Sequence, residues 1–152
     1  MRNTLVLVVL WLFASVAFGG EGKIQPLNVK PGQWQVTETF SATGLPSGMR
    51  NQPHTITYTN CVTQKDLSTN PFNDREQKCS WTVMNSTGSD MEVKGTGCAI
   101  EGMTADVHLK LHAVDSEHVK GSGEWTANGN GMSISGNATG SGKWMGATCS
   151  SQ

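Results

Sequence analysis

The chain has few hydrophobic residues and few charged ones. Of its 152 residues, 36% are hydrophobic and 15% are charged, and the 11 basic and 12 acidic side chains give a net charge of −1. These charges are scattered along the chain, with no run of one sign. Because contacts with phosphate groups need clustered Lys and Arg, nucleic acid and anionic membranes are not expected partners.

Motifs of common catalytic chemistry are also missing. The chain has no Gly-x-Ser-x-Gly sequence, which would place a nucleophilic serine on a sharp turn. It also lacks the glycine-rich fingerprint and following helix that bind a dinucleotide. We therefore expect no catalytic residue, no cofactor and no enzymatic activity. One alternative stays open, a small periplasmic hydrolase with paired carboxylates, because Asp and Glu residues far apart in sequence can meet in the fold.

A metal site is not expected either. His108 and His112 lie four residues apart, which on a strand separates them by about 13 Å and prevents them from sharing an ion. The seven methionines make a copper-binding periplasmic protein a second alternative, since thioether sulfur suits copper. However, neither Met-x-x-Met nor His-x-His occurs, and methionine commonly fills hydrophobic cores.

The N-terminal segment is typical of an export signal. Arg2 precedes an unbroken apolar run over residues 5–14, and small residues allow cleavage after Ala17 or Gly19. The run is too short to cross a membrane, which needs about 20 apolar residues. We therefore expect a protein that has no membrane anchor after cleavage and that is periplasmic or secreted.

The expected domain organisation follows from this signal and from composition. Residues 1–17 are predicted to be the signal peptide, residues 18–31 a flexible polar leader and residues 32–152 a single β domain. Within this domain, residues 63–78 form a long polar connection in which one helical turn is expected around Asp66 and Leu67.

Four cysteines, Cys61, Cys79, Cys98 and Cys149, predict two disulfides. An even number of cysteines in an exported chain is typical of a disulfide framework, and the spacings of 18, 19 and 51 residues do not suit zinc. A hairpin predicted around Gly88 would bring Cys79 close to Cys98. We therefore prefer the pairs Cys79–Cys98 and Cys61–Cys149. The alternative is Cys61–Cys79 with Cys98–Cys149.

The remaining sequence pattern is that of β-strands. Polar and apolar residues alternate along residues 33–40 and 105–114, as in half-buried strands. Glu38 interrupts the apolar face of the first segment, which indicates a bulge or a sheet edge. Further strands are expected at residues 54–62, 80–84, 91–98, 119–127, 132–139 and 143–148. The predicted fold is all-β, a single antiparallel meander of about 7–8 strands curled into a barrel or half-barrel and held by disulfides.

Glycine positions add detail to this fold. Asn128-Gly129-Asn130-Gly131 is the strongest turn signal in the chain and predicts a hairpin. Glycines two residues apart share one face of a strand, so the pairs at 95/97 and 121/123 would leave flat places where an aromatic ring can lie. Trp81, Trp125 and Trp144 are the candidates for these places.

Several short motifs resemble a known bacterial family, the domain of unknown function 3617. The segment Pro31-Gly32-Gln33-Trp34-Gln35-Val36 is similar to its PG-x-W-x-V start, and Cys61-Val62-Thr63 with Asp66 is similar to its C-[LV]-T-x-x-D element. The end of the chain, from Ser141-Gly142-Lys143 to Cys149, also resembles the family, although one residue is added before the last cysteine. Its members are small exported proteins, so the resemblance implies compartment and fold and implies no catalytic residue.

The sequence therefore predicts a non-catalytic, exported β domain that serves as a binding or structural module of the bacterial envelope. Its partner could be a small apolar ligand inside the barrel. It could also be an envelope protein that adds a strand at a sheet edge near Trp34.

Overall fold

The computed structural model describes residues 25–45, 52–64, 79–100 and 102–149. The predicted signal peptide, its cleavage sites and the helical turn expected around Asp66 lie outside these residues. No helix in the described part of the chain is long and apolar enough to span a membrane.

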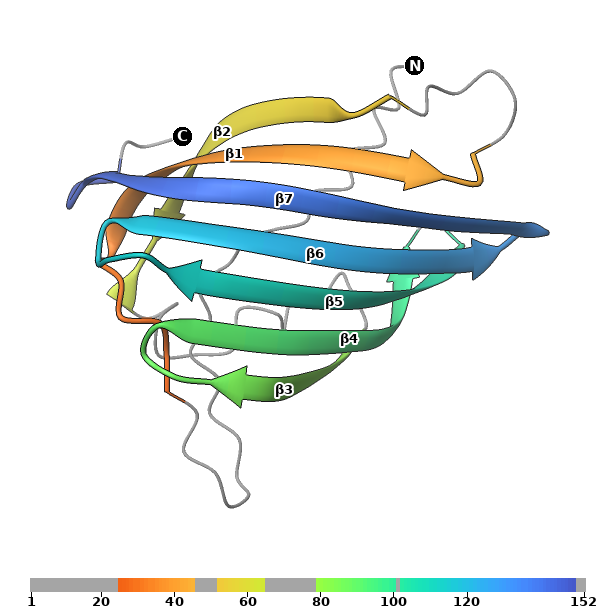
Figure 1. Cartoon of the computed structure of the whole chain (residues 1–152), viewed down its shortest axis with the longest axis horizontal. Helices are drawn as coiled ribbons and strands as arrows, with labels where there is room; N and C mark the ends of the chain where they lie inside the picture. The colour runs from red at the N-terminus through yellow and green to blue at the C-terminus, as the bar shows by residue number, and fades with distance from the viewer. Residues whose placement is uncertain (1–24, 46–51, 65–78, 101, 150–152) are drawn as a thin grey trace.

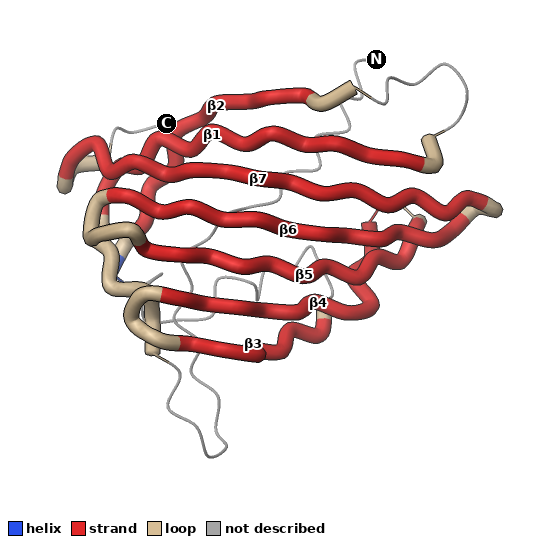
Figure 2. The backbone as a smooth tube through the Cα atoms, in the orientation of Figure 1, coloured by secondary structure: helices blue, strands red, loops and turns tan. Residues whose placement is uncertain are grey.

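Strands make up almost all of the described chain (Figure 2). They are β1 (Gly32–Thr43), β2 (His54–Val62), β3 (Ser80–Ser86), β4 (Asp90–Ile100), β5 (Met103–Ala113), β6 (His118–Gly129) and β7 (Met132–Gly146). All neighbouring strands are antiparallel, and they form one sheet in the order β2-β1-β7-β6-β5-β4-β3. The predicted all-β antiparallel fold is confirmed.

The sheet is open rather than closed, so it forms a half-barrel. Strands β2 and β3 are its two edges. Both ends of the sheet curl, since β2 and the end of β4 bend behind the central strands (Figure 1). Strands β3 to β7 follow one another as a meander, whereas β1 lies beside β7 and carries β2 on its outer side.

Two single strands differ in detail from the sequence prediction. Residues 132–146 form one strand instead of two, because β7 is held along its length by β6 on one side and β1 on the other. Strand β1 is not an edge, since it lies between β2 and β7. The irregularity in its pairing with β7 falls between Gln33 and Trp34, and Glu38 pairs regularly with Gly140.

The flexible leader predicted for residues 18–31 is also wrong over residues 25–31. Leu27 and Val29 are buried in the core, with only 3% and 8% of their surface exposed. The backbone N–H of Asn28 donates to the Gly88 carbonyl at 2.8 Å, and that of Lys30 donates to the Ser116 carbonyl at 2.9 Å. Two buried apolar side chains and these backbone hydrogen bonds therefore attach the segment to the sheet.

The two faces of the sheet differ in character because side chains alternate along each strand. One face, the core face, carries the buried cluster, which includes Trp34 and Val36 of β1 and Leu109 and Leu111 of β5. The other face, the polar face, carries mostly Ser, Thr, Asn and charged residues. Thr37 of β1 lies on it and bonds Thr57 of β2 at 3.0 Å through the two hydroxyls.

Two disulfides join Cys61 to Cys149 and Cys79 to Cys98, which are the pairs that the sequence favoured. The first connects β2 to the residues that follow β7, across the intervening strand β1. The second joins the chain just before β3 to the paired strand β4. Such cross-links restrict the unfolded chain and stabilise a fold with a modest core.

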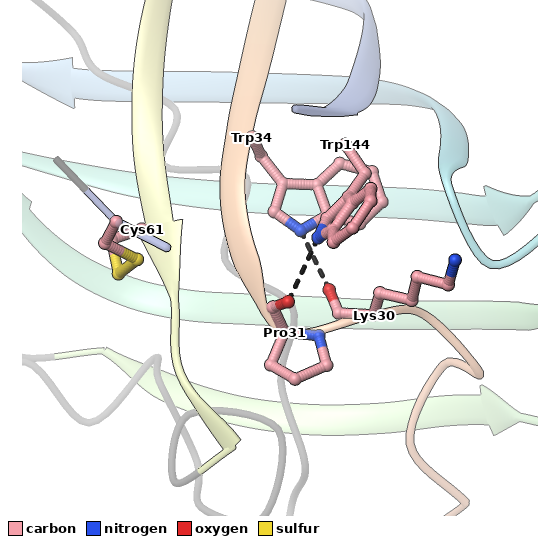
Figure 3. Close-up of a disulfide and its surroundings, with 6 residues drawn as sticks. Lys30, Pro31, Trp34, Cys61 and Trp144 are labelled. Atoms are coloured by element: carbon pink, nitrogen blue, oxygen red, sulfur yellow. Dashed lines mark hydrogen bonds between the residues drawn. A yellow bond between two sulfur atoms is a disulfide. The ribbon is translucent and has the colours of Figure 1, made fainter. Parts of the chain in front are cut away.

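The segment from Lys30 to Trp34 is fixed by two tryptophans (Figure 3). The indole N–H of Trp34, which is fully buried, donates to the Lys30 carbonyl at 3.0 Å. The indole N–H of Trp144, the residue paired with Trp34 on β7, donates to the Pro31 carbonyl at 3.0 Å. Gly32 has a φ of +136°, and a Cβ there would lie 2.2 Å from the Gly146 carbonyl oxygen. These residues therefore have a structural role.

Other glycines act as the sequence indicated, with one difference. Asn130 and Gly131 both have positive φ, 53° and 74°, as expected for the tight turn of the β6–β7 hairpin. The Trp81 ring lies against Gly95, where a Cβ would come within 2.8 Å of it. The Trp125 ring, however, lies against Gly136 rather than against the predicted pair at 121/123.

Candidate functional site

A shallow, open hollow of about 430 Å³ lies on the polar face of the sheet. Five strands contribute to it, because residues at matching register positions line up across the sheet. One row is Lys94, His108, Glu124, Asn137 and Ser41, from β4, β5, β6, β7 and β1 in turn. The next row is Asp106, Thr126, Ser135 and Thr43. All the side chains of both rows are polar.

The floor of the hollow comes from the residues between the two rows. Val107, Trp125 and Gly136 occupy these positions on β5, β6 and β7, and they pair with one another in register. The side chains of Val107 and Trp125 point toward the core face, since neighbouring residues of a strand point to opposite sides, and Gly136 has no side chain. The hollow therefore presents backbone at its floor and polar side chains at its walls.

Charged residues gather at the β4–β6 end of the hollow. Lys94 and Glu124 form no ion pair with another described residue. One oxygen of Asp106 accepts a 3.0 Å hydrogen bond from the backbone N–H of Gly97. His108 Nε2 lies 2.6 Å from the carboxylate of Glu92 on β4.

The β7–β1 end of the hollow is uncharged. The Ser41 hydroxyl donates to the Asn137 side-chain carbonyl at 2.5 Å, which orients this amide. The Thr43 and Ser135 hydroxyls bond each other at 3.0 Å. This end offers hydroxyl and amide groups that are already positioned by their neighbours, and the NH₂ of Asn137 can still donate to a ligand.

A second unusual group, the buried carboxyl of Glu38, lies on the core face. Glu38 has no exposed surface, and the Tyr58 hydroxyl on β2 donates to its Oε1 at 2.9 Å. Its Oε2 is buried and has no hydrogen-bond partner among the described residues. Burial raises the pKa of Glu38 to about 7, although the bond from Tyr58 partly offsets this effect. Glu38 is therefore expected to change its charge near neutral pH.

The described surroundings of Glu38 offer little room for a ligand. A void of about 10 Å³ lies at the neighbouring positions Val36, Gly140 and Gly142, and it extends to Val119 and Gly121 on β6. Such a volume holds about one water molecule. The hollow on the polar face is therefore the better candidate for a binding site.

The histidines that the sequence singled out are paired with acids. His108 and His112 lie on β5 and face Glu92 and Asp90 of β4, at 2.6 Å and 2.7 Å. Among the residues that the structure describes, no three His, Cys, Asp or Glu side chains are grouped to hold a metal ion. The prediction that the protein binds no metal stays a prediction.

The sequence motifs agree with a comparison against protein families. A family model described as "Protein of unknown function (DUF3617)" matches residues 29–149. The chain belongs to this family, as its motifs indicated. No curated protein and no solved structure matches the chain significantly.

Reasoning from sequence missed both the hollow and the role of Glu38. The two rows of the hollow combine residues from five strands, so they become visible only when the register between strands is known. Glu38 did carry a signal, since it stands on the apolar parity of its strand. The sequence pattern indicates a bulge or an edge at Glu38. In the structure the side chain is buried on the core face of β1, which is an interior strand of the sheet.

Proposed function

We propose that this protein is exported to the periplasm and that it is a non-catalytic binding module whose ligand occupies the polar-face hollow. The two disulfides support export, because disulfides persist in oxidising compartments. The signal-like segment before residue 18 and the small exported members of the family support it as well.

The observation that carries the binding role is the alignment of the two polar rows around one hollow. Its volume of about 430 Å³ falls in the range of small-ligand sites, roughly 300–1,000 Å³. The lining side chains are held on paired strands rather than on loops, so little order has to be gained on binding. The ligand that we propose therefore lies on the polar face, whereas the sequence led us to expect a small apolar ligand inside the barrel or a protein at the sheet edge.

Native mass spectrometry tests this proposal on protein isolated from the periplasm without denaturation. We expect an intact mass that corresponds to cleavage after Ala17 or Gly19, with additional mass from a retained ligand. Ser135→Trp would fill the hollow and remove that additional mass. Ser122→Trp adds the same side chain to the polar face at a position on β6 outside the hollow. This control variant should retain the ligand. Ligand retained by Ser135→Trp would refute the assignment of the hollow.

The hydrolase alternative has one observation in its favour. Asp106 and Glu124 both line the hollow and occupy diagonal positions on β5 and β6, where side chains are about 7–8 Å apart. Paired carboxylates of glycosidases have similar separations. Both side chains are exposed, however, and the strongly desolvated carboxyl, Glu38, lies on the opposite face. Oligosaccharide cleavage that is lost in Glu124→Gln would favour this alternative over a pure binding role.

A further inference from the structure

We propose that the hollow binds a neutral, hydroxyl-rich chain, a short oligosaccharide that lies across the strands. This inference rests on the proposed function, because it names the ligand class of the same hollow. It follows from the shape of the hollow, from the hydrogen-bonding groups on its walls and from the distribution of charge.

The shape and polarity of the hollow do not suit a compact apolar ligand. Sites for such ligands are concave and are lined mainly by apolar side chains. Here the side chains of both rows carry polar groups, and Val107 and Trp125 turn their side chains toward the other face. Binding can therefore combine hydrogen bonds with contact to the carbon atoms of an open, slightly recessed surface.

The uncharged end of the hollow matches the hydroxyl groups of a sugar. Ser, Thr and Asn side chains each offer a donor and an acceptor, and so does a sugar hydroxyl. Four such residues, Ser41, Thr43, Ser135 and Asn137, lie together at this end. The two bonds between them leave the Asn137 NH₂ and further hydroxyl lone pairs for a ligand.

The charged end disfavours an anionic ligand and still accepts hydroxyl groups. A polyanion would meet Asp106 and Glu124 and would find a single lysine, Lys94, among the residues of the hollow. A polycation would find carboxylates at this end alone, because the other end of the hollow has none. Carboxylates do accept strong hydrogen bonds from neutral hydroxyls, so a neutral polyol can use both ends of the hollow.

The length of the hollow favours a chain over a single sugar. The row from Lys94 to Ser41 crosses five neighbouring strands. Four steps of about 4.8 Å give a span of roughly 19 Å. An extended oligomer with a hydroxyl pattern that repeats along its length can contact several strands at once.

The experiment titrates the purified protein with four oligosaccharides and follows its backbone amides by NMR. Cellotetraose and tetra-N-acetylchitotetraose are the neutral probes, tetragalacturonate is the anionic probe and fully deacetylated chitotetraose is the cationic probe. We expect the neutral probes to bind most tightly and to shift amides at residues 41–43, 106–108, 124–126 and 135–137. Asn137→Ala should weaken binding roughly threefold to tenfold, the loss expected for one hydrogen bond. The matched variant Ser122→Ala, on the same face outside the hollow, should bind as the natural protein does.

The outcomes separate this inference from the function on which it rests. If no oligosaccharide shifts the amides at millimolar concentration, or if a charged probe binds most tightly, the oligosaccharide assignment is wrong. Ser135→Trp is then compared with the natural protein by native mass spectrometry. A retained ligand that this variant loses would preserve the hollow as the binding site of another class of molecule. If neither experiment detects binding at the hollow, both proposals are wrong.

Discussion

Tyr58 on β2 donates a 2.9 Å hydrogen bond to Glu38 Oε1 on β1, and this bond reaches a carboxyl that has no exposed surface. The other oxygen of the same carboxyl has no partner among the described residues. A buried acid with one unsatisfied oxygen is costly when ionised, which is why its pKa rises to about 7. The hydrogen bond between the edge strand β2 and the interior strand β1 thus involves a carboxyl whose charge depends on pH.

The stability of the protein should fall as pH rises because of Glu38. Its pKa is about 7 when folded and 4.5 as the ordinary value, so the folded state binds more protons between these pH values. The contribution of Glu38 to the free energy of unfolding is therefore fully present below about pH 4.5 and is lost as the pH rises through about 7. The loss between pH 5 and pH 8 is about 2–3 kcal/mol. Urea unfolding of Glu38→Gln should lack this decline. An equal decline in the variant would assign the pH dependence to other groups.

The two disulfides should contribute unequally to stability. The Cys61–Cys149 bond closes a loop with a sequence separation of 88, against 19 for Cys79–Cys98. In the chain-entropy account the longer loop contributes about 1.4 kcal/mol more. Thermal unfolding compares two double variants, Cys61→Ser/Cys149→Ser and Cys79→Ser/Cys98→Ser. The first should show the larger loss of stability.

A thiol reagent applied to the denatured, unreduced natural protein should label no cysteine.

Gly32→Ala should destabilise the fold strongly. The added Cβ would lie 2.2 Å from the Gly146 carbonyl oxygen, and the φ of +136° disfavours any side chain. We expect a loss of about 2 kcal/mol or more in the free energy of unfolding. Gly88→Ala is the matched control, since its Cβ would meet only Asn28 at an ordinary 3.9 Å. Equal stability of the two variants would contradict this account of the Pro31-Gly32 motif.

His108→Ala should leave the metal content of the protein unchanged. The imidazole faces Glu92 at 2.6 Å, and we assign it to this pair rather than to an ion. Elemental analysis of protein purified without chelators, before and after the change, provides the measurement. Stoichiometric metal that disappears with the histidine would revive the copper-binding alternative.

Much of the fold follows from local patterns in the sequence. The alternation along residues 105–114 predicted β5 almost to its ends, because one face of that strand is buried or half-buried while the other carries mostly exposed residues. The Asn-Gly turn at residues 128–131 predicted the β6–β7 hairpin, because two positive φ angles favour these residues. The joining of residues 132–146 into one strand was not predicted, since it depends on the two neighbours that hold β7.

The sequence by itself determined the strand pattern, the family and the expectation of an exported, disulfide-linked domain, because these depend on neighbouring residues and on composition. Only the tertiary structure decided that Glu38 is buried, that Leu27 and Val29 belong to the core and that two polar rows surround a hollow. The reason is register. A shift by one residue between strands would turn every side chain to the other face, and pairing between distant strands fixes that register.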